Sequence, residues 1–186
     1  MISMKMIRIA IVFLVLISGL MSAQNNTEIG QKAPEITMPR ADGSSFVLSS
    51  LKGKLVLIDF WATWCAPCVN EQPELKKLYA QFSDQVKNNS FEIVGVSLDK
   101  SKESWQKAID RFAISWIQIS DLKFWKSPVA KAYGIEELPF NLIIDGNGII
   151  IAKNLHDKEL EEFFKQKSET AIRGIIFIFI QWRCEF

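Results

Sequence analysis

The residues most able to do chemistry are two cysteines, Cys65 and Cys68, which enclose Ala66 and Pro67. A thiolate can attack a disulfide bond, and a second thiol one helical turn away can resolve the mixed disulfide that forms. A lone C-x-x-C can also be half of a zinc site, but no second pair completes it and His156 is the only histidine. A c-type haem attachment would need histidine directly after the second cysteine, where this chain has valine. The pattern therefore predicts redox chemistry and no metal.

A strand followed by a helix is expected to position the pair. Leu55–Ile58 is a short apolar run typical of a strand buried on both faces, and helical spacing after Cys68 continues to about Lys87. The first N–H groups of a helix lack partners and favour a thiolate. Cys65, nearer the helix start and expected to be more exposed, is the predicted nucleophile, and Cys68 is the predicted resolving thiol. An inert structural disulfide is a weak alternative, because so short a loop restrains little of the unfolded chain.

The other segments alternate between strand and helix patterns. A hairpin is expected around Asp42-Gly43, and Pro73 is expected to bend the helix after the cysteines. The further expected strands are Phe91–Ser97, Trp116–Ile119, Phe140–Ile144 and Ile149–Ala152, and the further expected helices are Lys102–Phe112, Pro128–Tyr133 and Lys158–Lys167. This order predicts an α/β domain.

Length, charge and the N-terminus limit the function classes. The chain has 186 residues, enough for one domain, and its net charge of +1 gives no electrostatic case for nucleic acid. Met1–Ala23 has a basic start, an apolar stretch from Ile9 to Leu20 and small residues at its end, as a secretory signal peptide does. An uncleaved membrane anchor is the alternative interpretation.

At Asp59–Cys68, read DFWATWCAPC, the chain resembles the active-site segment of the thioredoxin superfamily. With Glu71 and Pro73 following, it is most similar to the periplasmic TlpA/ResA-type thiol–disulfide oxidoreductases. The resemblance covers roughly residues 29–167. It implies a thioredoxin fold, in which helices flank a central mixed β-sheet, with an added N-terminal β-hairpin and an inserted helix.

Two carboxylates are candidates for proton transfer. Asp59 follows an apolar strand, where an ordinary aspartate would be solvated at a turn; the resemblance implies a buried acid behind Cys68 instead. Burial would raise its pKa and suit a general base. Thioredoxins often pair this acid with a lysine on the neighbouring strand, but Phe91–Leu98 contains none. Glu71 is either a solvated helix residue or, as the resemblance implies, an acid that tunes the thiols, and many members of that branch lack the aspartate.

The expected substrate contacts are Trp64, Ala66, Pro67, Leu138 and Pro139. Trp64 is expected in an exposed apolar rim that a partner covers, whereas Trp61 is expected in the core. The resemblance makes Leu138-Pro139 a cis-proline loop facing the cysteines, although a trans bond is the commoner form. Phe140 departs from the polar residue common at its position in the family.

The resemblance implies an enzyme that needs no cofactor besides the Cys65–Cys68 disulfide. We expect a monomer in the bacterial periplasm that reduces disulfides of exported proteins and takes electrons from a membrane-linked donor. A peroxiredoxin-like peroxidase of the same fold is one rival, but neither cysteine has threonine three residues earlier. A redox-inert binding module is the other, and the intact C-x-x-C argues against it.

The last 19 residues, Ser168–Phe186, fall outside the resemblance. Gly174–Ile180 is apolar and uncharged, too short to span a membrane, and prone to aggregate if exposed. This tail either covers an apolar patch or lies beyond a domain that ends near Lys167. Cys184, within it, is not expected to be catalytic.

Overall fold

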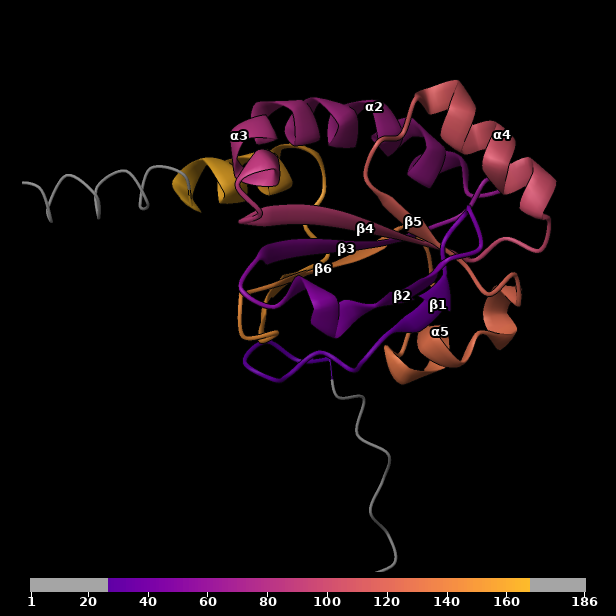
Figure 1. Ribbon diagram of the computed structural model, residues 1–186, viewed down its shortest axis with the longest axis horizontal. Helices are drawn as coiled ribbons and strands as arrows, with labels where there is room; N and C mark the ends of the chain where they lie inside the picture. Colours follow the sequence, from indigo (N-terminus) through magenta and orange to yellow (C-terminus); the bar gives the residue numbers. More distant parts are fainter. Residues whose placement is uncertain (1–26, 168–186) are drawn as a thin grey trace, which may run out of the picture.

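The computed structural model describes residues 27–167, which form a central sheet with helices on both faces (Figure 1). Five strands lie in the order β5-β4-β3-β6-β7. Strands β3, β4 and β5 are parallel, whereas β6 is antiparallel to β3, and β7 to β6. Their bounds are Leu55–Trp61 (β3), Phe91–Ser97 (β4), Ile117–Ile119 (β5), Phe140–Ile144 (β6) and Ile150–Lys153 (β7). The predicted thioredoxin fold, with a mixed sheet, is confirmed.

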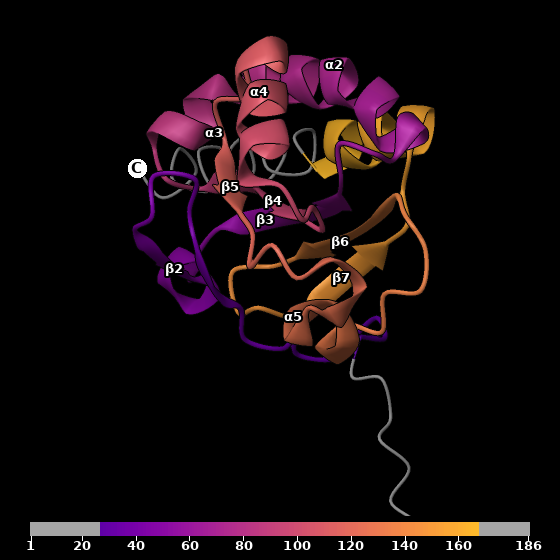
Figure 2. The ribbon, with the colours of Figure 1, turned by 90° about the vertical axis from the view of Figure 1, so that its right-hand side faces the viewer.

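The predicted N-terminal hairpin is also present. Strand β1 (Thr37–Pro39) pairs antiparallel with β2 (Ser45–Val47), and a short 3-10 helix, η1 (Leu48–Leu51), leads toward β3. In Figures 1 and 2 this hairpin and α5 (Pro128–Ala132) lie on the side of the sheet away from α2 (Ala66–Gln81).

Helix α2 begins with the cysteine segment and lies on one side of the sheet. Helices α3 (Ser83–Lys87) and α4 (Lys102–Phe112) and a last helix over residues 157–167 are on the same side (Figure 2). Ser101 caps α4 as expected, because its hydroxyl accepts from the Ser104 N–H at 3.1 Å. Pro73 is accommodated inside α2.

The predicted extent of the helix after the cysteines was wrong. The helix after the cysteines does not continue to Lys87: it ends at Gln81, and α3 starts after Phe82. The break lets the Phe82 ring pack against Phe91 and Phe164, with centroids 5.2 and 5.3 Å away. The apolar run Leu55–Ile58 is the first part of β3, which continues to Trp61. Asp59 therefore lies inside the strand rather than at a turn.

The core is built on both faces of the sheet from apolar side chains of every strand in it. Trp61 is fully buried, as predicted, and its indole N–H donates to Gln118 at 3.0 Å. The predicted signal peptide (1–23) and the tail (168–186) with Cys184 lie outside the described residues. Between residues 27 and 167, no helix is long and apolar enough to cross a membrane.

Candidate active site

The site forms where three parallel strands end. Strands β3, β4 and β5 run in the same direction, so the segments that follow them meet at one edge of the sheet. The segment after β3 carries the cysteines, and the segments after β4 and β5 lie beside it. Side chains that are far apart in the sequence are thereby brought together.

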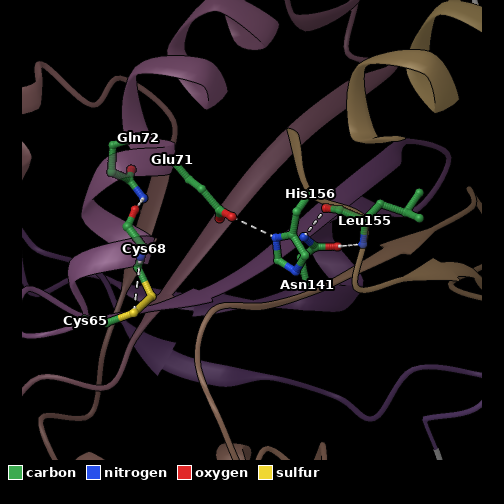
Figure 3. A network of polar contacts seen from close by, with 7 residues as sticks. All are labelled: Cys65, Cys68, Glu71, Gln72, Asn141, Leu155 and His156. Atoms are coloured by element: carbon green, nitrogen blue, oxygen red, sulfur yellow. Dashed lines mark hydrogen bonds and ion pairs between the residues drawn. A yellow bond between two sulfur atoms is a disulfide. The ribbon is translucent and has the colours of Figure 1, made fainter. Parts of the chain in front are cut away.

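The two cysteines form a disulfide across the first turn of α2 (Figure 3). The S–S distance is 2.04 Å and the Cα–Cα distance is 5.3 Å. Cys65 is the N-cap, and its sulfur accepts a hydrogen bond from the Cys68 N–H at 3.3 Å. Both are buried in this oxidised state: Cys65 is 5% exposed and Cys68 1%. The first-turn N–H groups can stabilise a thiolate at Cys65 once the bond is reduced.

A buried carboxylate fixes the segment that enters the helix. The Asp99 side chain, just beyond β4, accepts from the Thr63 N–H at 3.1 Å and from its hydroxyl at 2.6 Å. Ser97 donates to the same carboxylate at 2.8 Å. The cysteine segment is therefore tied to the end of β4, and Asp99 is a positioning residue that the sequence interpretation missed.

Asp59 lies within β3, the strand that leads into the cysteine segment, and is 3% exposed. Its neighbours in register, Gly95 on β4 and Asn141 on β6, are uncharged. Burial, and secondarily the charge of Glu71, raises the pKa of Asp59 from 3.8 to about 7, and Gln72 opposes the shift. The carboxyl can therefore exchange a proton near neutral pH.

Glu71 reaches from α2 toward the loop before the last helix (Figure 3). Its carboxylate oxygen lies 2.9 Å from Nδ1 of His156, an ion-pair distance if the imidazole is protonated. Nδ1 is buried and has no hydrogen-bond partner among the described residues. Burial raises the pKa of Glu71, His156 lowers it, and Asp157 raises it.

Asn141 holds the loop that carries His156. Its side-chain amide donates to the Leu155 carbonyl at 2.6 Å, and its oxygen accepts from the Leu155 N–H at 3.1 Å. This pair of bonds fixes the backbone next to the histidine (Figure 3). Asn141 also neighbours Asp59, so one residue of β6 links the loop to the buried acid.

We call the space enclosed by these groups the acidic cavity: about 440 Å³, lined among others by Asp59, Glu71, Asn141 and His156. Leu57, Leu75, Leu78 and Leu160 supply apolar walls. Gln72 connects it to the redox pair, since its amide donates to the Cys68 carbonyl at 3.3 Å and also faces Asp59. The cavity provides a route by which protons can reach Asp59.

The remaining predicted substrate contacts are the residues next to the cysteines and the Leu138-Pro139 pair. The Leu138–Pro139 bond is cis, as the resemblance implied, and both residues are half-buried. Ala66 and Pro67 are exposed, and Trp64 is 46% exposed. The structure thus brings the predicted catalytic residues together in one site. His156, Gln72, Asn141 and Asp99 were missed as site residues, and only the isolated histidine was a visible signal.

No group of three or more histidine, cysteine, aspartate or glutamate side chains in residues 27–167 is arranged to hold a metal ion.

Comparison with known proteins identifies the family to which this chain belongs. The sequence profile of the AhpC/TSA family matches residues 29–153. The thiol–disulfide oxidoreductase ResA of Bacillus cereus is 32% identical over 162 residues, covering 81% of this chain and 85% of that protein.

Solved structures give the same result. A thiol–disulfide oxidoreductase from Bacteroides fragilis superposes with a TM-score of 0.68 at 32% identity, covering 73% of this chain and 98% of that one. The thioredoxin domain of a thiol–disulfide oxidoreductase from Bacteroides vulgatus has a TM-score of 0.68 at 36% identity, covering 75% and 96%. The chain therefore belongs to the AhpC/TSA family of the thioredoxin superfamily, and within it to the ResA-type thiol–disulfide oxidoreductases.

Proposed function

We propose that this protein is an exported reductant of protein disulfides. The observation that carries the proposal is the Cys65–Cys68 pair at the start of α2 with a buried acid of raised pKa in the strand that leads into it. The helix start favours a thiolate at the first cysteine, and the acid provides a proton site near the second.

The reaction begins when the Cys65 thiolate attacks one sulfur of the partner's disulfide. A mixed disulfide forms, and the other partner sulfur leaves as a thiolate that takes up a proton. Cys68 loses its proton to Asp59 and attacks Cys65, which releases the second partner sulfur. The partner gains two electrons and two protons, and the protein is left with the Cys65–Cys68 disulfide.

A second dithiol must then restore the reduced state. We propose that a membrane-linked dithiol donor supplies the two electrons and two protons, since the oxidising space outside the cytoplasm does not keep thiols reduced. In this return step Asp59 gives its proton back to Cys68. Glu71 and His156 set the charge of the cavity through which Asp59 exchanges protons.

Reduction rather than oxidation is favoured by the charges around the thiols. Ala66 and Pro67 provide neither a charge nor a side-chain hydrogen-bond donor to a thiolate. Asp59 and Glu71, where ionised, disfavour a thiolate beside them. A destabilised thiolate makes the disulfide the preferred state and the dithiol the better electron donor.

The test is the reduction potential of the Cys65–Cys68 pair, measured by equilibration with a glutathione series. We expect a value near the thioredoxin end of the range, about −270 mV, rather than the strongly oxidising end at about −120 mV. A pair that stays reduced in mildly oxidising buffer would identify an oxidase and overturn the proposal. Consumption of hydrogen peroxide at a rate matching disulfide reduction would instead favour the peroxidase alternative.

Export is tested separately. Edman sequencing of protein recovered from the extracytoplasmic fraction should begin close to residue 24 if Met1–Ala23 is a cleaved signal. Recovery of the full N-terminus from the membrane fraction would instead support an uncleaved anchor.

A further inference from the structure

Three aromatic rings form a cluster beside the redox pair, which we call the aromatic surface: Trp64, Phe124 and Trp125. The Trp64 ring lies 5.0 Å from Phe124 and 5.9 Å from Trp125, and the latter two are 6.0 Å apart. Trp64 is 46% exposed and Trp125 38%. In residues 27–167 only one other large apolar side chain, Ile29, is exposed to this degree. The concentration next to Cys65 is therefore not the ordinary scatter of surface hydrophobic residues.

The surface is held in place by contacts with neighbouring segments. The Trp64 indole N–H donates to the Leu98 carbonyl at 3.2 Å. Ser120 donates to the Ser97 carbonyl at 2.8 Å, which ties the segment after β5 to the end of β4. Lys100 lies with its ammonium 4.3 Å from the centroid of the Phe124 ring, a cation–π contact. The rings are thus presented as a pre-formed surface.

The backbone that delivers Phe124 is strained. Leu122 and Phe124 have φ angles of 56° and 58°, in the left-handed region that large side chains rarely adopt. Residues in this conformation persist where surrounding contacts or function require them. Here the unusual turn places Phe124 against the exposed Trp64 instead of in the core.

Positive charge borders the aromatic surface. Lys100 contacts Phe124, and Lys123 and Lys126 flank the two aromatic residues in the chain; all three lysines are exposed. Asp121 is the one carboxylate in residues 121–126, where it accepts from the Lys123 backbone N–H, and Glu103 pairs with Lys107. With Lys100, this segment therefore carries more positive than negative charge. A partner of complementary charge is therefore acidic.

We propose that the aromatic surface and its three lysines dock polypeptide substrates that carry a large apolar side chain and acidic residues beside their disulfide. The inference rests on the proposed reductase function and specifies its substrate class. An apolar side chain of the partner covers Trp64 and Trp125, its carboxylates face the lysines, and its disulfide then lies at Cys65. A small disulfide is too short to reach Trp125 and gains nothing from the surface.

The test uses synthetic peptides, each closed by one disulfide. One carries phenylalanine and two aspartates beside the cysteines, a second has lysines for the aspartates, and a third has alanine for phenylalanine. We expect the first to be reduced about tenfold faster than the second at low ionic strength, with the difference shrinking as salt is added. We expect the first peptide to be reduced about threefold faster than the third, because the third lacks the ring that contacts the aromatic surface.

Variants locate the effect. In each variant the rate with the acidic aromatic peptide is divided by its rate with bis(2-hydroxyethyl) disulfide. Trp125→Ala should lower this ratio about fivefold, and Lys123→Glu with Lys126→Glu should reverse the preference between acidic and basic peptides. Two variants are matched controls. Ile29→Ala removes an exposed apolar side chain outside the aromatic surface, and Lys52→Glu reverses a charge near the start of β3, whereas the cysteines follow the end of that strand. Neither should change the ratio.

Equal rates for all peptides, with the small disulfide still reduced, would overturn the docking site and leave the reductase function intact. Failure to reduce any disulfide would overturn the function. Docking is then decided by peptides with serine for cysteine: their titration should shift the indole N–H signals of Trp64 and Trp125 in NMR spectra. Absence of such shifts would overturn the docking site independently of activity.

Discussion

The redox pair separates two regions of opposite character. The acidic cavity is lined by residues of β3, α2 and the last helix, and of its carboxyl groups Asp59 is buried and Glu71 half-buried. In the aromatic surface, Trp64 and Trp125 face solvent and lysines surround them. Burial changes the proton affinity of the first region, whereas exposure leaves the second free to contact a partner. We therefore expect substitutions in the cavity to alter pH dependence, and substitutions in the surface to alter substrate preference.

The largest effect is expected from the cysteines, on which both regions depend. Cys68→Ala should abolish turnover and accumulate a mixed disulfide with the substrate, because Cys65 can still attack but nothing resolves the adduct. Cys65→Ala should also abolish turnover but trap little adduct. Non-reducing electrophoresis or mass spectrometry of the two variants measures this, and equal trapping by both would contradict the order of attack.

Asp59→Asn is expected to have the next largest effect and to act through the cavity alone. Without the proton site near Cys68, disulfide exchange at neutral pH should slow about 10²-fold, within the range for general acid–base catalysis. Stopped-flow measurement across pH checks this, and the pH profile should flatten around 7. The ratio between peptide and small-disulfide rates should not change, which distinguishes the acid from the docking surface.

Asp59→Asn should also change the stability of the protein, and the sign of this change follows from the raised pKa of Asp59. The folded protein binds a proton on Asp59 more tightly than the unfolded chain does, so the contribution of Asp59 to stability is largest below pH 4 and falls as pH rises toward 7. A shift from 3.8 to about 7 corresponds to a loss of up to about 4 kcal/mol. Oxidised Asp59→Asn should be more stable than wild type at pH 8 and lack most of this decline. Urea unfolding at several pH values measures it; an equally steep decline in the variant would contradict the assignment.

Smaller effects, on the pKa values of two different carboxyl groups, are expected from substitutions of Glu71 and His156. Glu71→Gln should lower the pKa of Asp59, because it removes a charge that raises it. His156→Gln should raise the pKa of Glu71, because it removes the partner that lowers it. Carboxyl carbon NMR titration of the oxidised protein measures both. Glu103→Gln is the matched control, since Glu103 lies outside the acidic cavity and pairs with exposed Lys107.

The smallest effect is expected on the free energy of unfolding when a residue of the aromatic surface is substituted. Trp125→Ala should lower the free energy of unfolding by only about 1 kcal/mol, because the side chain lies outside the core and loses chiefly its contacts with Trp64 and Phe124. Thermal or urea unfolding measures it. A loss of several kcal/mol would mean that the cluster serves the fold, and the two regions would then differ less than proposed.

The position of Cys65 could be predicted from the sequence because its causes are local. An apolar strand, a C-x-x-C pair and a proline in the first turn lie within about fifteen residues, and they specify a helix start wherever the segment is placed. The strand Phe91–Ser97 and the helix Lys102–Phe112 were also predicted with their observed bounds, because periodicity and a serine cap mark them. The resemblance added the cis bond before Pro139 and a buried acid at position 59.

The partners of these groups were decided only by the tertiary structure. His156 lies 85 residues from Glu71 in the chain, and the two meet because α2 and the last helix pack on the same face of the sheet. Phe124 reaches Trp64 because parallel strands end at one edge, and because its own backbone adopts a conformation that its residue type does not favour. Local spacing determines which residues a strand or helix presents. Packing between distant segments determines which charges and rings become neighbours, and therefore the pKa of Asp59 and the composition of the aromatic surface.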